Sequence, residues 1–396
     1  MKLRTHKSVD KSLLTTEGYI NYRRYILRPQ DAESAAQLKK LSGSKTVVPL
    51  DIALGTDSLP FKITVPMMLE MSYWAAKMSS YQDTEEHLLR THGIKISDDT
   101  IRQVVNYLGR LVFEEDCREA DQAMYLFNAC QIPDDHSKSG VLYLQTDGAA
   151  VNTRSKDENN SSWRENKLAL AFSSDNIHYW TSRTGEHQHR ILKREYVSFI
   201  GSVQDFRAHF LALALRSGYG HYRETILLSD GATWIRSLKE EVFPDAQQIL
   251  NLFHLKENTY AFAKAIFHAD PVKYNPWAED ICNQLEDGKW QQVLRSLAPY
   301  RDMQAGAGFV NLYTYIDNNK NNIDYPLYKR NGWFVGSGTI ESSNKIVMQN
   351  RLKPQGVRWN TTTAQYMLSL KAKLESGLWD TYVVPFIFYN MLGERP

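Results

Sequence analysis

Two aspartates stand in matching local sequences, each after an apolar run and before Gly-Ala. Asp147 lies in "VLYLQTDGAAV" (141–151) and Asp230 lies in "TILLSDGATWI" (225–235). A carboxylate that comes just after a buried strand is held by the sheet and still reaches its edge. If the two strands are neighbours, the two carboxylates lie close together and repel each other unless a cation sits between them. The competing interpretation is that each Asp-Gly pair is an ordinary turn.

A third acid would turn such a pair into a site for phosphodiester transfer. Mg²⁺ prefers oxygen ligands and keeps waters that a phosphate can replace, and two such ions activate an attacking oxygen and stabilise a leaving one. Glu341, in "GSGTIESSNK", is the candidate, because it is the only acid between 338 and 373. The same segment carries six basic residues: Lys345, Arg351, Lys353, Arg358, Lys371 and Lys373. That setting suits a phosphate backbone; the alternative is a solvated glutamate favoured by the helix dipole.

The segments around these acids predict a mixed sheet. "VLYLQT", "KLALAFSS" and "IHYWTS" have the pattern of three consecutive strands. A helix, "SVQDFRAHFLALALRSG", leads to the strand "TILLSD", a helix beginning near Gly231 and the short strand "QQILNL". This order resembles a ribonuclease H-like mixed α/β sheet flanked by helices, formed here by 136–254 and 331–375. Residues 255–330 lack strand patterns and are expected to form a helical insertion, and 376–396 a C-terminal tail.

The N-terminal third predicts two further parts. Residues 1–60 are expected to be β-rich, with strands in "GYINYRRYIL" and "TVVPLDIAL" separated by a polar loop. Residues 61–135 are expected to be helical, and "YQDTEEHLLRTHGIKISDDTIRQVV" has the glycine-containing turn and Ser-capped second helix of a helix-turn-helix. The side chains off its apolar stripe, and so candidates for DNA contact, are Thr100, Arg102, Gln103 and Asn106. The alternative is a plain helical packing unit.

The bulk composition excludes some classes and leaves others open. The net charge of +2 neither requires nor excludes a polyanionic partner. No apolar run is long enough for a membrane span, and the first residues lack an apolar signal core. The three cysteines are far apart and form neither a disulfide framework nor a zinc motif, which suits a reducing cytoplasm.

Several blocks together resemble the bacterial insertion-sequence DDE transposases, especially the Lre and Kra groups, which are relatives of the mutator-like superfamily. The blocks are "TDGAAV", "WRENK", "SDGATWI", "GTIESSNKIVMQNRLKPQGVRW" and "AQYMLSLKAK", with "TTEGYINYRRY" and "VVPLDIALG" near the start. The resemblance implies a catalytic and metal-binding triad of Asp147, Asp230 and Glu341, with two Mg²⁺ or Mn²⁺ ions. It also implies double-stranded DNA as partner, both the terminal inverted repeats of the element and its target, a homodimer on DNA, and a location on the bacterial nucleoid in the cytoplasm.

The resemblance also points to positions that would handle DNA. The family carries a Cys/Asp-x-x-His motif after the second aspartate; here it is "NLFH", so His254 matches but Asn251 departs. The alternative interpretation is that His254 is a packed histidine at a strand-helix junction. In "WRENK", Arg164 and Lys167 are either contacts to the DNA backbone or part of an ordinary polar loop. The remaining predicted DNA contacts are Lys345, Arg351, Lys353 and Arg358.

Two other functions stay open at this point. One is a different ribonuclease H-like nuclease that cuts without joining. The other is a catalytically inactive or domesticated DNA-binding protein that uses the helix-turn-helix alone.

Overall fold

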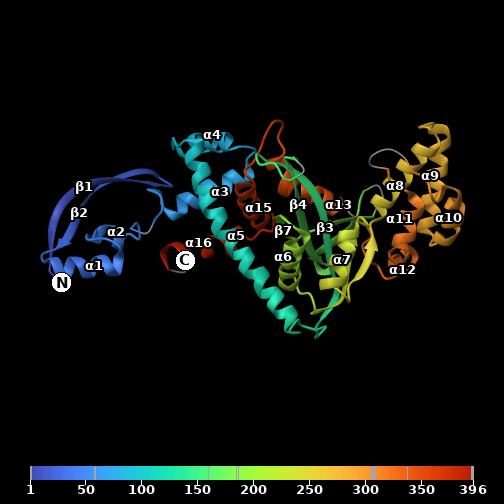
Figure 1. Cartoon of the computed structure of the whole chain (residues 1–396), viewed down its shortest axis with the longest axis horizontal. Helices are drawn as coiled ribbons and strands as arrows, with labels where there is room; N and C mark the ends of the chain where they lie inside the picture. The colour runs from blue at the N-terminus through green and yellow to red at the C-terminus, as the bar shows by residue number, and fades with distance from the viewer. Residues whose placement is uncertain are drawn as a thin grey trace. The chain divides into compact units, whose positions relative to one another are not determined.

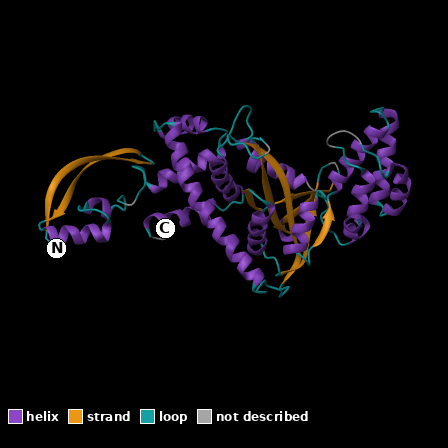
Figure 2. Ribbon diagram, viewed as in Figure 1, coloured by secondary structure: helices purple, strands orange, loops and turns teal. Residues whose placement is uncertain are grey.

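The computed structural model describes residues 2–57, 59–158, 160–183, 185, 187–304, 309–336 and 338–393. The chain divides into two compact units. One comprises Met1–Glu114 with Thr362–Pro396, and the other comprises Glu115–Thr361. Figure 1 shows their elements, and Figure 2 shows that strands and helices occur in both units. No helix of the described residues is long and apolar enough to cross a membrane.

The second unit is built on a five-stranded mixed sheet. Its strands are β3 (Lys138–Asn152), β4 (Trp163–Ser173), β7 (Glu195–Ile200), β8 (Tyr222–Ser229) and β9 (Gln247–Leu250). Their order across the sheet is β7-β4-β3-β8-β9. The β7-β4 and β4-β3 pairs are antiparallel, whereas β3-β8 and β8-β9 are parallel. The mixed α/β fold expected from the sequence is therefore present.

Helices cover both faces of this sheet. On one face, α6 (Val203–Arg216) and α7 (Thr233–Val242) bury a core that includes Leu144, Phe210 and Leu227. On the other, α13 (Gly338–Ser343) contacts β3 and continues into the π-helix η4 (Asn344–Gln349) and α14 (Asn350–Leu352). β4 is buried from Asn166 to its end, which accounts for the continuous apolar run at 168–172.

The third sheet strand is not the one expected. "IHYWT" forms β5 (Ile177–Thr181), which pairs only with β6 (His187–Ile191) in a separate two-stranded hairpin. Most of β5 is exposed. The strand that joins the sheet is β7, which buries Tyr196 and Val197 against β4.

The helical insertion is present and follows β9 directly. Its helices are α8 (Leu252–Ile266), α9 (Pro271–Glu286), α10 (Trp290–Leu297), α11 (Leu312–Asn319) and α12 (Tyr325–Arg330). Two hydrogen bonds tie its return to its point of departure. Tyr325 Oη donates to the Leu250 carbonyl at 2.9 Å, and the Leu252 amide donates to the Val335 carbonyl at 3.3 Å. The chain thus comes back to the sheet beside β9 before entering α13.

The first unit starts with a long hairpin of β1 (Leu3–Thr15) and β2 (Gly18–Pro29). The β-rich prediction for 1–60 is only half right. The segment expected to be a polar loop contains α1 (Ala32–Ser42), and "TVVPLDIAL" contributes one isolated bridge at Val47 and the short helix α2 (Pro49–Ala53). Asp51 of α2 is buried against cations of the hairpin, which accounts for the helix packing there.

Helices complete the first unit. Its helices are α3 (Val65–Lys77), α4 (Tyr81–His92) and the first half of α5 (Asp98–Asn128), joined by α15 (Thr361–Glu375) and α16 (Val384–Leu392) from the end of the chain. The second half of α5, from Glu115, belongs to the second unit. Gly109 lets α5 and α15 approach closely, since a Cβ there would lie 2.8 Å from the Tyr366 carbonyl oxygen. Lys371 Nζ donates to the Ala76 carbonyl at 2.9 Å. These contacts place nearly all of α15 in the first unit, whereas the sequence grouped it with the sheet, and the expected C-terminal tail is largely helical.

Candidate metal centre

The strand register brings the two aspartates together. In the parallel ladder between β3 and β8, Gln145 is the partner of Leu228. This is the last pair of the ladder; Asp147 comes two residues after Gln145 in β3, and Asp230 comes two residues after Leu228, just past the end of β8. Neighbouring strands are about 4.8 Å apart, so these two carboxylates share one edge of the sheet. The charge of Asp230 raises the pKa of the Asp147 carboxyl, so the two side chains lie near each other, as the matching strands predicted.

The two aspartates differ in their backbone setting. Asp147 does not end its strand, because β3 continues in antiparallel pairing with β4 from Asp147–Leu168 to Asn152–Trp163. The competing interpretation of an ordinary turn at Asp147 is therefore wrong, and so is the expectation that Asp147 comes just after its strand. Only the parallel ladder to β8 stops before it. Asp230 does follow the end of β8.

Asp230 is held by a turn that requires glycine. Gly231 has a φ of +87°, and a Cβ there would lie 2.9 Å from Leu250 Cδ1. The Asp230 side chain accepts a hydrogen bond from the Ala232 amide at 2.8 Å, just before α7 begins. Tyr315, from α11 of the insertion, donates to the Asp230 carbonyl at 2.7 Å. The insertion thus braces the backbone of this site.

Asp147 is more tightly held and more buried. Its Oδ1 accepts from the Gly148 amide at 2.7 Å, and its Oδ2 accepts from Asn344 Nδ2 at 2.6 Å. Burial raises the pKa of the Asp147 carboxyl, and the charge of Asp230 raises it further. The two hydrogen bonds and His254 oppose this rise. An unneutralised pair of carboxylates is therefore costly here.

Glu341 and His254 reach the same region from different elements. Glu341 lies on α13, and its Oε1 is 4.0 Å from His254 Nε2. The other ring nitrogen of His254 lies 3.1 Å from Glu257 Oε2 on the same helix. The helix that carries His254 begins at Asn251, whose side chain caps it by accepting from the Phe253 amide at 2.9 Å. Asn251 is buried. Although it departs from the Cys or Asp of the family motif, it still caps the helix.

Asn344 is a site residue that the sequence did not single out. It is 3% exposed, and its Oδ1 makes no hydrogen bond within the described part of the chain. It stands three residues after Glu341, so both side chains lie on one face of their helix. η4 starts at Asn344, and such π-helical turns are frequent at functional sites. The three-residue spacing of Glu341 and Asn344 in "ESSN" was the sequence feature that could have identified Asn344 as a site residue.

The donor set fits a divalent cation, although the acids are not gathered as tightly as a loaded site requires. Asp147 and Asp230 offer carboxylate oxygens whose mutual repulsion a cation would relieve, and the bare Oδ1 of Asn344 adds an oxygen beside them. Among the described residues, no group of three or more His, Cys, Asp or Glu side chains is close enough to hold a metal ion. Glu341 Oε1 lies 4.0 Å from His254 Nε2.

Two of the predicted DNA contacts are buried. Lys167 is 2% exposed, and its Nζ donates to the Gly201 carbonyl at 2.8 Å and pairs with Glu165 at 2.7 Å. Arg351 is 4% exposed, and its guanidinium lies over the Trp359 ring, 5.0 Å from the centroid. Both side chains pack within the second unit, so neither presents its charge to a phosphate.

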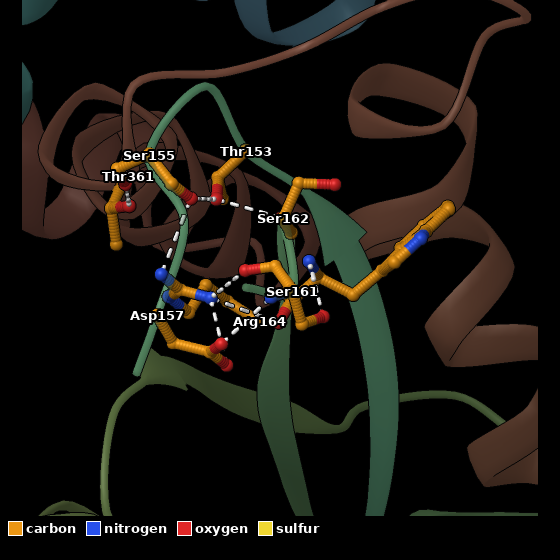
Figure 3. A network of polar contacts seen from close by, with 8 residues as sticks. Thr153, Ser155, Asp157, Ser161, Ser162, Arg164 and Thr361 are labelled. Atoms are coloured by element: carbon orange, nitrogen blue, oxygen red, sulfur yellow. Dashed lines mark hydrogen bonds and ion pairs between the residues drawn. The ribbon is translucent and has the colours of Figure 1, made fainter. Parts of the chain in front are cut away.

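Arg164 organises its own loop. Figure 3 shows its guanidinium among the residues of the β3-β4 connection. It pairs with Asp157 at 3.3 Å and donates to the carbonyls of Ser161 at 2.9 Å and Ser155 at 3.2 Å. These bonds favour the bland interpretation of "WRENK", in which Arg164 closes a polar loop.

The other predicted contacts remain accessible in part. Lys345, Lys353 and Arg358 are exposed. In the helix pair of the first unit, Arg102 and Gln103 are exposed but both bind Asp99 on the same helix. The remaining two candidates, Thr100 and Asn106, are half-buried. The helix pair itself is present, with Gly93 in the left-handed turn between α4 and α5; DNA binding by it stays a prediction.

Comparison with known proteins gives one distant relative. No protein-family model matches the chain. The chain is 23% identical over 383 residues to a protein described as "UPF0236 protein in vanSb 3'region" from Streptococcus gallolyticus. The alignment covers 92% of this chain and 72% of that protein. The chain is therefore similar, across most of its length, to a UPF0236 protein.

Proposed function

We propose that this protein is a DNA transposase that cuts and joins phosphodiesters with a DDE triad of Asp147, Asp230 and Glu341. The observation that carries the proposal is the closeness of Asp147 and Asp230 where the parallel β3-β8 ladder ends, with Glu341 on α13, the helix that contacts β3. The strand order β7-β4-β3-β8-β9 supports a ribonuclease H-like domain. The resemblance of the sequence blocks to insertion-sequence transposases supports the reaction.

In this proposal the protein side chains position the reactants. Asp147 and Asp230 would hold two Mg²⁺ or Mn²⁺ ions, and Glu341 would serve as the third ligand. Bound ions would supply a lowered pKa for an attacking water or 3′-hydroxyl and charge stabilisation at the leaving oxygen. Asn344 orients the Asp147 carboxylate through its 2.6 Å hydrogen bond. His254 holds Glu341 by its charge when protonated.

The test uses the full-length protein and duplexes taken from the DNA that flanks its gene. Wild-type protein with Mg²⁺ is expected to cut at the ends of the element and to join the freed 3′ ends to a plasmid. Asp230→Asn is expected to abolish cutting while binding of the same duplex in EDTA is kept. Because Asn retains the hydrogen bond from the Ala232 amide, loss of activity would report the carboxylate charge. Cutting by Asp230→Asn would refute the proposal.

The two rival functions give different results in the same assays. Cutting without joining would identify a ribonuclease H-like nuclease of another kind. Binding without Mg²⁺-dependent cutting in the wild-type protein would identify a DNA-binding protein without transposase activity.

A further inference from the structure

The β1-β2 hairpin is an exposed and strongly basic ribbon. Residues 2–29 contain seven lysines and arginines against two acids, whereas the whole chain has a net charge of only +2. Most side chains of both strands are exposed or half-buried, so the ribbon is not the covered layer of a core. Figure 2 shows it as a long, curved pair of strands. Basic charge is therefore concentrated on an element whose side chains bury little surface against the rest of the unit.

Part of this charge is already neutralised inside the unit. Lys11 and Arg24 pair with the buried Asp51, and Arg23 pairs with Asp10. Four exposed cations remain, Lys2 just before β1 and Arg4, Lys7 and Arg28 within the strands, and none has an ion pair of this kind among the residues that the structure describes. They are the charges left for a partner.

The strand register places Arg4, Lys7 and Arg28 on one face of the hairpin. Arg4 and Arg28 are directly opposite each other across the hairpin. The register shifts between Thr5 and Lys7, and this bulge pairs Lys7 with Ile26, two residues before Arg28. Without the extra residue Lys7 would point to the opposite face from Arg4. Like charges directly opposite in a hairpin are destabilising, so this arrangement favours an anionic ligand.

We propose that the β1-β2 ribbon is a second DNA-binding element, with Arg4, Lys7 and Arg28 contacting phosphates of a duplex. Duplex DNA offers phosphates in regular rows, and its major groove admits a two-stranded β-ribbon. The proposal rests on the proposed function for the choice of DNA as the polyanion. It differs from the expected helix-turn-helix contact, where Arg102 and Gln103 are engaged by Asp99.

The experiment measures binding of the full-length protein to a labelled duplex of mixed sequence, in EDTA, over about 50 to 200 mM NaCl. The test variant is Arg4→Gln/Lys7→Gln/Arg28→Gln. The matched control is Arg190→Gln/Arg223→Gln/Arg295→Gln, which removes three exposed charges of the second unit. The ribbon variant is expected to bind about tenfold or more weakly, with a slope of log K against log salt reduced by about 2–3. The control slope is expected to change by less than about 1.

Folding and assembly are checked in the same samples. The thermal midpoint of the ribbon variant is expected to be unchanged or higher, since the Arg4–Arg28 repulsion is removed. Equal salt slopes for the two variants would overturn the inference. The cations would then serve to prevent the exposed strand edges from pairing with other chains. A change of oligomeric state with an unchanged slope would also overturn it, because a second copy of the chain would then occupy the ribbon. The binding assay contains no metal, so a protein that fails to cut DNA can still show DNA binding by the ribbon. Conversely, an unchanged salt slope in the ribbon variant would not contradict the proposed DDE triad.

Discussion

Replacing Asp230 by Asn should make the metal-free protein more stable while removing its response to Mg²⁺. Asn keeps the size of the side chain and the acceptor for the Ala232 amide. What it removes is the charge opposite Asp147. If the carboxylates are about one strand spacing apart, roughly 5 Å, and the effective dielectric constant is about 20–40, the repulsion amounts to about 2–3 kcal/mol.

This free energy has a measurable consequence. In EDTA at neutral pH, the variant is expected to unfold roughly 4–10 °C above the wild-type protein. With Mg²⁺ at about a hundred times its Kd, the wild-type protein gains about 2.7 kcal/mol and the order approaches equality or reverses. Thermal unfolding followed by circular dichroism in both buffers measures the difference. Asp245→Asn, at an exposed position of the same unit, is the control and should change stability by less than about 0.5 kcal/mol.

The pH dependence supplies an internal check. The pKa of Asp147 is raised from its ordinary value of 3.8, so the folded state holds this proton more tightly than the unfolded state. The resulting destabilisation is absent below 3.8 and grows as pH rises through the raised pKa. The gap between variant and wild type should therefore close as the solution is acidified. A variant less stable than wild type in EDTA at pH 7, or one that Mg²⁺ stabilises equally, would refute the reasoning.

Substitutions at three further positions test other parts of the structure. Asn344→Ala is expected to lower kcat for strand cutting at least tenfold with little change in DNA binding, because Asp147 loses the donor that orients it; Asn344→Gln with wild-type kcat would contradict a requirement for this geometry. Asn251→Asp should retain the cap of α8 and the stability of the protein, whereas Asn251→Ala should lower the free energy of unfolding in urea by about 1 kcal/mol. An Asn251→Ala variant as stable as Asn251→Asp would argue against the cap. Asp51→Asn should destabilise the first unit by about 3 kcal/mol, since it leaves buried cations uncompensated, and protection of the hairpin amides in hydrogen exchange measures this; unchanged protection would contradict it.

The sequence by itself determined much of the local structure. The apolar run "LALAF" (168–172) is typical of a buried strand, and the apolar stripe of 101–112 predicts the start of α5. Both Asp-Gly pairs and the isolated Glu341 were visible because each stands out from its immediate neighbours. Local composition is enough for these features, since strand and helix patterns have periods of only a few residues.

Only the tertiary structure decided which of these residues meet. The alignment of Asp147 with Asp230 depends on the β3-β8 register, and a parallel pairing across a long crossover leaves no local signature. The choice of β7 over β5 as the third sheet strand follows from which segment can bury its side chains against β4. Lys167 shows the same limit, because its burial against the Gly201 carbonyl depends on the neighbouring strand. Long-range pairing and burial are properties of the packed chain, so residue type and spacing indicated the candidate residues, and only the packing decided which of them lie together.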